Sequence, residues 1–347
     1  MNSLLRTHNT LRLDADCEDL VEFCDEAQLV ALLSCSVSNK CPDLILGYGS
    51  NVVLPTYYPG RVLLNRIEGI DVVSDTDDGV LVSVGAGEVW HDFVVYALSK
   101  NWYGLENLAM IPGSVGAAPV QNIGAYGTEI SDFVVSCEVY CRQTMRTLCL
   151  PASECDFGYR TSLFKTEGRG RYVILRVHFL LLKSPKVHFA YPRLKQYVQK
   201  SGLPATPHLI FDAVCHIRSS RLPCVDTVGT VGSFFVNPIV DRACFERLER
   251  SFACSFDHTD LPDGRVKLYV GNLLSLLGWQ GAGEFGFRLH ANPIVLVHDG
   301  GGSQDVCLNF VGKVLSSVYS VFGLHLDIEP EVVSGSLIEA PLSVSGV

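Results

Sequence analysis

The sequence lacks several features that define large classes of protein, beginning with an excess of positive charge. Its 27 lysines and arginines are outnumbered by 37 aspartates and glutamates, and the formal net charge is −10. A nucleic-acid-binding domain needs a basic surface to neutralise phosphates, so this balance argues against nucleic acid as a partner. Long hydrophobic runs are also missing. The apolar segment 173–182 includes Arg176 and His178 and is far shorter than the roughly 20 residues of a membrane-spanning helix.

Metal-binding and disulfide patterns are missing as well. The thirteen cysteines form no C-x-x-C pair, and the ten histidines follow no metal-ligand spacing. We therefore expect no metal site. The first residues, 1–13, have no apolar core of a secretory signal. These observations favour a cytoplasmic protein whose cysteines are reduced and pack as small hydrophobic side chains.

Two familiar nucleotide-binding loops are absent too. The pattern G-x-G-x-x-G would need glycine at Val52 after the turn 47–49, or at Trp90 after the turn 85–87. The pattern G-x-x-x-x-G-K-[ST] does not occur. The sequence therefore disfavours both a Rossmann dinucleotide site and P-loop phosphoryl transfer.

What the sequence does contain is a run rich in glycine, proline and alanine from Gly104 to Gly127. Its composition disfavours a long helix, and its side chains are too small for an ordinary strand. A second glycine-rich turn, 47–51, follows the apolar run 44–46. Glycine lets main-chain N–H groups approach a ligand closely, as in phosphate-binding nests. A tightly turning buried loop has the same composition, so the run alone leaves both interpretations open.

Together these motifs resemble the UDP-N-acetylenolpyruvoylglucosamine reductase family, flavoenzymes of peptidoglycan precursor synthesis. The resemblance extends from Asn9 to Val332. It rests on L-G-Y-G-S-N-V-V, V-G-A-G-E-V-W-H, the whole run 104–127, F-G-Y-R-T-S, G-S-F-F-V-N-P and E-P-E-V, in that order. The segment A-Y-P-R-L around Tyr191 is similar to the tyrosine-bearing loop of one of the two types of the family.

The resemblance implies an α+β fold with three domains. A small α/β domain (1–67) and a larger α+β domain (68–221, with a C-terminal return of 325–347) would bind FAD, and an α+β domain (222–324) would bind substrate. Local patterns fit this alternation of helix and strand. Asp25 can cap a helix whose third residue is Gln28. We further expect strands at 44–46, 52–54, 62–64, 80–84, 133–140, 172–182 and 294–298, and helices at 89–98, 208–220, 243–252 and 303–322.

The resemblance also implies ligands and site residues. The cofactor would be non-covalent FAD, with NADPH as hydride donor, and the substrate a UDP-sugar enolpyruvyl ether bound by a monomer. The cofactor-binding residues would be Gly47, Gly49, Ser50, Asn51, Pro112, Gly113, Ser114, Gly116, Ala117, Asn122, Gly124, Ala125 and Tyr126. The substrate-binding residues would be Tyr126, Tyr191, Arg218, Arg221 and Asn237, and the catalytic residues Arg160, Ser233 and Glu331.

In the implied reaction, hydride reaches C3 of the enolpyruvyl group from the flavin and a proton reaches C2. Arg160 would stabilise the enolate, because its planar guanidinium binds carboxylates bidentately and stays charged. Glu331 would act with it, which requires a protonated or hydrogen-bonded carboxyl group. Ser233 would deliver the proton. Taken singly, each residue also has a purely structural interpretation: a surface ion pair for Arg160, a solvated carboxylate for Glu331 and a turn for Ser233.

Two alternative functions remain at this stage. An FAD-linked alcohol oxidase could share the flavin scaffold, but the turn 47–51 has no histidine for a covalent flavin link. A non-catalytic UDP-sugar-binding protein would not need a proton donor such as Ser233. The sequence also departs from the family pattern at Leu11, at Val236 and loosely over 278–293, which affects substrate and nicotinamide contacts rather than the flavin motifs.

Overall fold

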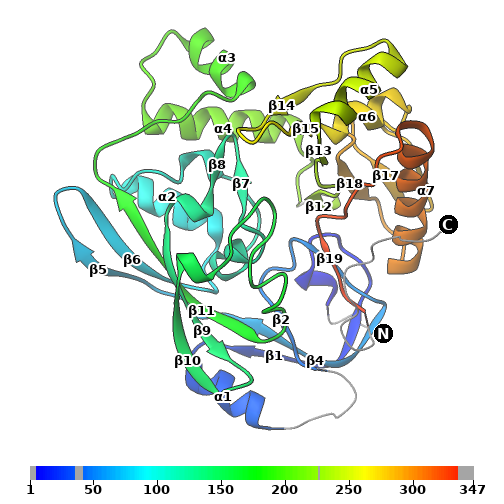
Figure 1. Cartoon of the computed structure of the whole chain (residues 1–347). Coiled ribbons are helices and arrows are strands. Elements are labelled where there is room, and N and C mark those ends of the chain that lie inside the picture. Colours follow the sequence, from blue (N-terminus) through cyan, green and yellow to red (C-terminus); the bar gives the residue numbers. More distant parts are fainter. Residues whose placement is uncertain (1–4, 36–41, 226, 335–347) are drawn as a thin grey trace. The chain divides into compact units, whose positions relative to one another are not determined.

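The computed structural model describes residues 5–35, 42–225 and 227–334 (Figure 1). The chain divides into two compact units. Unit 1 comprises Met1–Glu18, Ser50–Pro59 and Leu222–Val347, and unit 2 comprises Asp19–Gly49 and Gly60–Arg221. Each unit has a hydrophobic core of its own. The division into three domains expected from the sequence stays a prediction.

Unit 2 is built on a five-stranded antiparallel sheet in the order β10-β9-β11-β6-β5. In its centre, Val177 lies opposite Val84 on one side and Cys137 on the other. The strands expected at 80–84, 133–140 and 172–182 are confirmed. The five strands are β5 (Ile70–Asp75), β6 (Gly79–Gly85), β9 (Val134–Cys141), β10 (Arg146–Pro151) and β11 (Tyr172–Leu182).

Helix α2 (Trp90–Ser99) covers this sheet. The expected amphipathic pattern holds, because Trp90, Phe93 and Val94 are buried and the Phe93 ring lies 5.1 Å from that of Phe179 in β11. Short elements connect the sheet strands: η2 (Glu106–Leu108), η3 (Val115–Gln121), β7 (Gly124–Ala125), β8 (Thr128–Glu129), η4 (Ile130–Asp132) and η5 (Ala152–Glu154).

The start of unit 2 holds helix α1 (Glu26–Ser34), whose cap was predicted. The Asp25 carboxylate accepts a hydrogen bond from the Gln28 backbone N–H at 2.8 Å. Strand β2 (Leu44–Leu46) pairs in parallel with β4 (Tyr57–Asn65), and β1 (Asp16–Phe23) completes a sheet in the order β1-β4-β2. Strands β1 and β4 both begin in unit 1 and continue in unit 2.

Two helices close unit 2, α3 (Pro192–Ser201) and α4 (Pro207–Arg221). Helix α4 buries Ile210, Val214 and Ile217. Leu209 and Phe211 are half-buried at the edge of the same core. The helix expected at 208–220 is therefore confirmed, and one of its faces is packed.

Unit 1 contains a four-stranded sheet in the order β12-β18-β17-β16 and a three-stranded sheet in the order β13-β15-β14. The strands are β12 (Gly229–Ser233), β13 (Ile239–Val240), β14 (His258–Asp260), β15 (Val266–Leu268), β16 (Gly283–Glu284), β17 (Phe287–Leu289) and β18 (Val295–His298). Its helices are α5 (Arg242–Phe252), α6 (Val270–Leu276) and α7 (Gln304–Phe322), so the helices expected at 243–252 and 303–322 are confirmed.

Helix α7 is, within the described part of the chain, the one helix long and apolar enough to cross a membrane by length and composition. It buries Phe310, Val314 and Val318 in the core of unit 1. Burial of one face in a core is the packing of a globular-domain helix.

Two segments of unit 1 that are distant in sequence are joined by backbone pairing. Strand β19 (Glu331–Val332) pairs in parallel with β3 (Val52–Val53), with Glu331 opposite Val52. The sequence predicts that residues 325–347 return to residues 68–221, and this stays a prediction; residues 335–347 lie outside the described residues.

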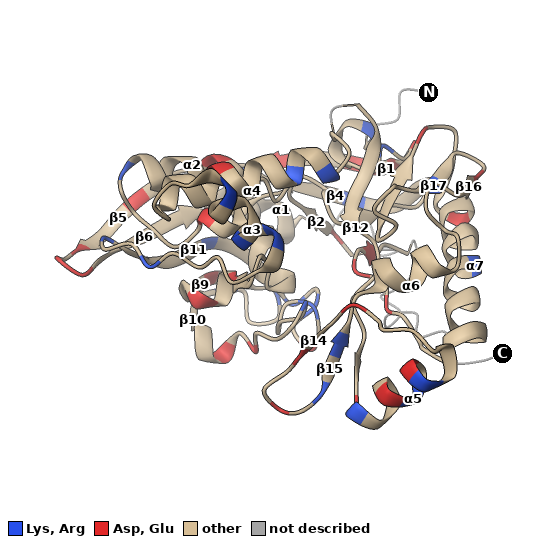
Figure 2. Cartoon of the chain, turned by 90° about the horizontal axis from the view of Figure 1, so that it is seen from above, with Lys and Arg blue, Asp and Glu red and all other residues tan. Residues whose placement is uncertain are grey.

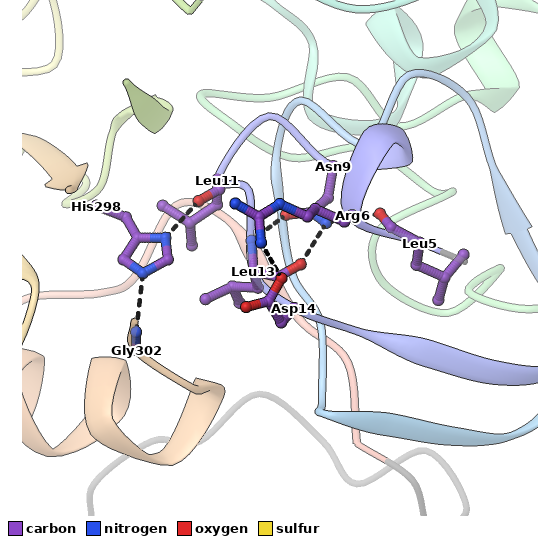
Figure 3. Close-up of polar contacts among 8 residues, drawn as sticks. All are labelled: Leu5, Arg6, Asn9, Leu11, Leu13, Asp14, His298 and Gly302. Carbon is purple, nitrogen blue, oxygen red and sulfur yellow. Dashed lines mark hydrogen bonds and ion pairs between the residues drawn. The ribbon is translucent and has the colours of Figure 1, made fainter. Parts of the chain in front are cut away.

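The N-terminal segment of unit 1 is held by side chains (Figure 3). After η1 (Arg6–His8), the Asn9 amide donates to the carbonyls of Leu5 (2.8 Å) and Leu13 (3.1 Å) and accepts from Leu13 N–H (2.9 Å). His298 at the end of β18 donates from Nδ1 to the Leu11 carbonyl at 2.8 Å and accepts at Nε2 from Gly302 N–H at 3.1 Å. These bonds connect the N-terminal segment to the loop that precedes α7.

Acidic and basic side chains are interspersed along the chain, as on α5, where both colours alternate (Figure 2). Among the described residues there is no group of three His, Cys, Asp or Glu side chains placed to hold a metal ion. The described cysteines are free thiols, and Cys17, Cys137, Cys141, Cys155 and Cys307 are buried.

Candidate active site

Three glycine-rich turns meet in unit 2. A Cβ atom added to Gly47 would overlap the Ser114 hydroxyl, so the turn at the end of β2 touches the turn before η3. Gly116 N–H donates to the Ala86 carbonyl at 2.9 Å, and a Cβ on Gly116 would lie 2.5 Å from the Ala86 Cβ. The third turn, 85–87, is therefore packed against the second without room for a side chain.

Local conformation explains why the run 104–127 has its composition. Gly113 has φ 126°, a value open to glycine but strained for other residues. The two helical pieces of the run are 3₁₀ turns of three and seven residues, as expected of a sequence that disfavours a long helix. Asn122 ends η3 in the left-handed region, which asparagine tolerates better than most residues.

This cradle fits a flavin nucleotide. Its backbones approach one another where only the small side chains of alanine and Ser114 intervene, which leaves the main chain open to close contact with a pyrophosphate. Pro112 and Ala117 are exposed and Gly113 and Gly116 half-buried, so the turn is accessible. Gly47 and Gly49 belong to unit 2, and the next two residues, Ser50 and Asn51, belong to unit 1.

The side chain of Asn122, a predicted cofactor residue, is fully engaged within the protein. Its side chain is 1 % exposed, and its Nδ2 donates to Glu129 Oε2 at 2.9 Å and to the Gly158 carbonyl at 3.1 Å. Its Oδ1 accepts from Ser131 N–H at 3.1 Å. An amide has two donor hydrogens, and both are used within the protein.

Arg160 lies beside the end of this run. Its Nη2 donates to the Gly124 carbonyl in β7 at 2.8 Å, and its guanidinium lies 5.2 Å from the centre of the Tyr159 ring. Arg160, Asn122 and Tyr126 all have positive φ angles (56°, 47° and 52°). Left-handed conformations at non-glycine residues are uncommon and collect at functional sites.

Three of the predicted substrate residues also gather in unit 2. The rings of Tyr126 and Tyr191 meet edge to face with centroids 5.3 Å apart. Burial raises the pKa of the Tyr126 hydroxyl, while the charge of Arg218 acts in the opposite direction. The Arg218 Nε is buried and has no hydrogen-bond partner among the described residues, and burial lowers the pKa of its guanidinium. Such an orphaned cationic donor suits an anionic ligand. Arg221 ends the same helix and is half-buried.

His91, at the start of α2, has a structural role. Its Nδ1 accepts a hydrogen bond from Met110 N–H at 3.1 Å, and its ring stacks on Phe211 with an interplanar angle of 5°. Burial lowers the pKa of the imidazole, which favours the neutral ring that this hydrogen bond needs.

Ser233 lies in unit 1 at the end of β12, opposite Val295 of β18. Gly232 before it has φ 74°, and the two phenylalanines after it are fully buried. Phe235 pairs antiparallel with Ile328, and the Glu329 N–H donates to the Phe234 carbonyl at 2.9 Å. Counting along this pairing places Ser233 near Pro330, one residue before Glu331.

Glu331 is held by the backbone of the turn 47–51. Its N–H donates to the Asn51 carbonyl at 2.9 Å, and the side chain of Gln304 donates to the carbonyls of Val53 (2.7 Å) and Val333 (2.8 Å). One hydrogen bond therefore connects Glu331, a predicted catalytic residue, to Asn51, a predicted cofactor-binding residue. Asn237, predicted to bind substrate, accepts from Val270 N–H at 3.0 Å and so supports the start of α6.

Sequence reasoning does not single out Asn107 or Gln304, although each bridges two backbone segments that carry predicted site residues. Asn107 lies inside the run 104–127, so the motif itself is a signal for it. Gln304 has no local signal, because the strands that it joins are distant in sequence.

The comparisons with known proteins point to one family, and the relatives match this chain over 94 % of its length. The family model described as an FAD binding domain matches residues 19–144, and that described as the UDP-N-acetylenolpyruvoylglucosamine reductase C-terminal domain matches residues 223–333. The chain is 40 % identical to the UDP-N-acetylenolpyruvoylglucosamine reductase of Burkholderia multivorans over 330 residues, 94 % of each chain. It is 38 % identical to that of Bdellovibrio bacteriovorus, over 94 % of this chain and 97 % of the relative.

A solved structure adds the fold. The reductase of Thermus caldophilus superimposes with a TM-score of 0.65 at 21 % identity, covering 95 % of this chain and 97 % of the other. That likeness confirms the predicted α+β fold, with an FAD-binding domain and a family-specific C-terminal domain. The chain belongs to the UDP-N-acetylenolpyruvoylglucosamine reductase family.

Proposed function

We propose a division of labour among this chain's residues in the family's reaction. As a member of that family the protein is an FAD-dependent oxidoreductase of peptidoglycan precursor synthesis, with NADPH as the reductant. Bound FAD supplies the hydride chemistry, taking hydride from NADPH and passing it to the substrate. The protein supplies binding, charge stabilisation and a proton.

The three turns 47–49, 85–87 and 113–116 form the cradle for the flavin nucleotide. Their mutual contacts support this role, because they bring three main-chain turns together with only the small side chains of alanine and serine between them. The flavin is held without a covalent bond. Denaturation followed by filtration tests this: all of the flavin should pass the filter, and flavin retained with the polypeptide would contradict it.

Arg160, Glu331 and Ser233 carry the chemistry. When hydride adds to C3, negative charge develops on the carboxylate side of the enolpyruvyl group, where the guanidinium of Arg160 stabilises it. We assign Glu331 to the same step, in which it assists Arg160 by hydrogen bonding. Ser233 donates its hydroxyl proton to C2, and solvent reprotonates it after turnover. The observation that carries this assignment is the backbone pairing of 234–236 with 327–329, which, continued by one residue, supports proximity of Ser233 and Glu331.

Tyr126, Tyr191, Arg218, Arg221 and Asn237 bind the UDP-sugar. The buried, unpartnered Arg218 Nε beside two tyrosine rings supports a phosphate at this place. Tyr191 precedes α3, an arrangement that supports the type of the family with a tyrosine-bearing loop. We also assign the protein to the cytoplasm, where NADPH and UDP-sugars are made, and to a monomeric state. Light scattering on the purified chain measures that state directly.

The test of the mechanism separates the two half-reactions in the holoenzyme. Ser233→Ala should leave flavin reduction by NADPH almost unchanged and slow reoxidation by the enolpyruvyl substrate by roughly 10²–10⁴-fold, the usual contribution of a positioned general acid. Ser233→Cys, whose thiol can donate a proton, should recover part of that loss. Stopped-flow absorbance follows both halves. Equal slowing of both, or normal reoxidation, would assign Ser233 to the turn alone.

A further inference from the structure

Asn107 connects two backbone segments with one side chain. It lies in η2, its side chain is 2 % exposed, and its Nδ2 donates to the Tyr126 carbonyl at 3.2 Å and to the His188 carbonyl at 2.9 Å. The two hydrogens of one amide are thus divided between two segments that are far apart in sequence. A buried donor that loses its acceptor is costly, so both contacts are strongly favoured in the folded state.

The two segments carry the aromatic residues of the proposed substrate site. Tyr126 has φ 52°, a conformation that a bulky residue keeps only when its surroundings hold it. His188 lies three residues before Tyr191, in the connection 183–191 between β11 and α3, which has no regular secondary structure. By fixing the main chain at both places, Asn107 sets the separation at which the two tyrosine rings meet.

The element that carries Asn107 is itself anchored. The single Gly104 N–H is shared between the two carboxylate oxygens of Glu106, at 2.9 and 3.0 Å. The Trp90 Nε1 of α2 donates to the Leu108 carbonyl at 2.8 Å, inside the core. The residues on both sides of Asn107 are therefore fixed to the rigid part of unit 2, so that its amide can act as a fixed reference point for a connection without secondary structure.

We propose that Asn107 is a positioning residue for substrate binding, which holds the Tyr191 connection against Tyr126 before the UDP-sugar arrives. The inference rests on the proposed roles of Tyr126, Tyr191 and Arg218. Without the amide, the connection 183–191 loses its hydrogen bond at His188 and keeps the packing of Val187 and Phe189 against the core, so binding must restore the order that is lost. Preorganisation acts on affinity rather than on chemistry. Losing two hydrogen bonds of ordinary strength corresponds to roughly 10-fold to 100-fold weaker binding.

The test compares Asn107→Ala with Asn65→Ala in the holoenzyme. Asn65 is a matched control in unit 2, a buried amide that donates to the Ile174 carbonyl at 2.9 Å and accepts from Ile67 N–H at 3.1 Å. Asn107→Ala should raise KM and the dissociation constant of the UDP-sugar substrate roughly 10-fold or more, with flavin content and reduction by NADPH unchanged. Asn65→Ala should lower the melting temperature without changing the affinity.

Two further measurements separate positioning from general destabilisation. Hydrogen exchange in substrate-free holoenzyme should accelerate over 183–191 in Asn107→Ala and not in Asn65→Ala. In a double-mutant cycle, Asn107→Ala should weaken binding much less when Tyr191 is already alanine, because the residue acts through Tyr191. If Asn107→Ala does not fold, Asn107→Asp replaces the variant, since it keeps the shape and removes the donors.

The outcomes distinguish this inference from the proposed function. If Tyr191→Ala and Arg218→Ala both bind substrate normally, the proposed substrate site is wrong and the inference falls with it. If those variants lose affinity while Asn107→Ala or Asn107→Asp binds normally, the site stands and Asn107 is not a positioning residue. Additive effects of Asn107→Ala and Tyr191→Ala, or unchanged exchange over 183–191, would overturn the inference as well.

Discussion

The contact between Gly116 and Ala86 makes a sharp prediction about the flavin cradle. In Gly116→Ala the new Cβ would lie 2.5 Å from the Ala86 Cβ, 3.0 Å from its Cα and 3.1 Å from its carbonyl oxygen. Ala86 is buried and two of these atoms belong to its backbone, so the clash cannot be relieved by rotating a side chain. The two turns must move apart, which also stretches the hydrogen bond from Gly116 N–H to the Ala86 carbonyl.

Overpacking of this kind typically lowers the free energy of unfolding by about 1–3 kcal/mol. For a unit of 150–250 residues each kcal/mol corresponds to roughly 2–4 °C, so the melting temperature should fall by about 2–12 °C. Because the displaced backbone is the proposed flavin cradle, the purified variant should also carry less flavin than the parent. Circular dichroism reports the melting, and absorbance after denaturation and filtration reports the flavin content.

A compensating substitution and a control complete the experiment. Ala86→Gly removes the closest atom of the clash and should restore part of both losses in the double variant. Gly312→Ala, in α7 with nothing within 4 Å of the added Cβ, should instead stabilise by up to about 1 kcal/mol and leave flavin content unchanged. Full flavin content and an unchanged melting temperature in Gly116→Ala would refute the close packing of the turns 85–87 and 113–116.

Three further predictions concern other polar contacts. Gln304→Ala removes the two side-chain hydrogen bonds to the Val53 and Val333 carbonyls, which support the backbone pairing of β3 with β19, and stopped-flow kinetics should show slower flavin reoxidation by substrate than in Ser303→Ala, which weakens only the cap of α7. Burial raises the pKa of the Glu106 carboxyl in the folded protein. The contribution of this raised pKa to the free energy of unfolding is present in acid and is lost as pH rises through that pKa. The free energy measured by urea unfolding from about pH 4 to 8 should show this loss in the parent and not in Glu106→Gln. Arg61→Met leaves the Asp43 carboxylate without its bidentate partner and should lower the urea-unfolding free energy by about 3 kcal/mol, a loss that Asp43→Asn in the same chain should reduce.

Local features of this fold could be predicted from the sequence because their causes are local. The cap of α1 needs only Asp25 and Gln28, which are three residues apart, and the packed face of α2 follows from the spacing of its apolar residues. The composition of the run 104–127 likewise predicts turns. In these places one short segment determines its own conformation.

Other features depend on pairs that are distant in sequence and could not be derived from either partner alone. Nothing around Gly47 indicates that it touches Ser114, and nothing around Gln304 indicates that its amide joins β3 to β19. The partial burial of Leu209 and Phe211 is a smaller example, because the edge of a core is set by neighbouring elements. The roles of Arg160, Ser233 and Glu331 came from the family resemblance and stay predictions.

The pairing of β3 with β19 also bears on the order in which the protein can be made. Translation proceeds from the N-terminus, so β3 leaves the ribosome early and its partner is among the last described residues to be synthesised. Until then β3 has an open edge, which is a hazard for association with other chains. A chain that stops before Glu331 would keep that open edge and would lack the proposed catalytic carboxylate. Pairing of the β3 edge and delivery of the proposed catalytic carboxylate would therefore depend on the same two residues, Glu331 and Val332.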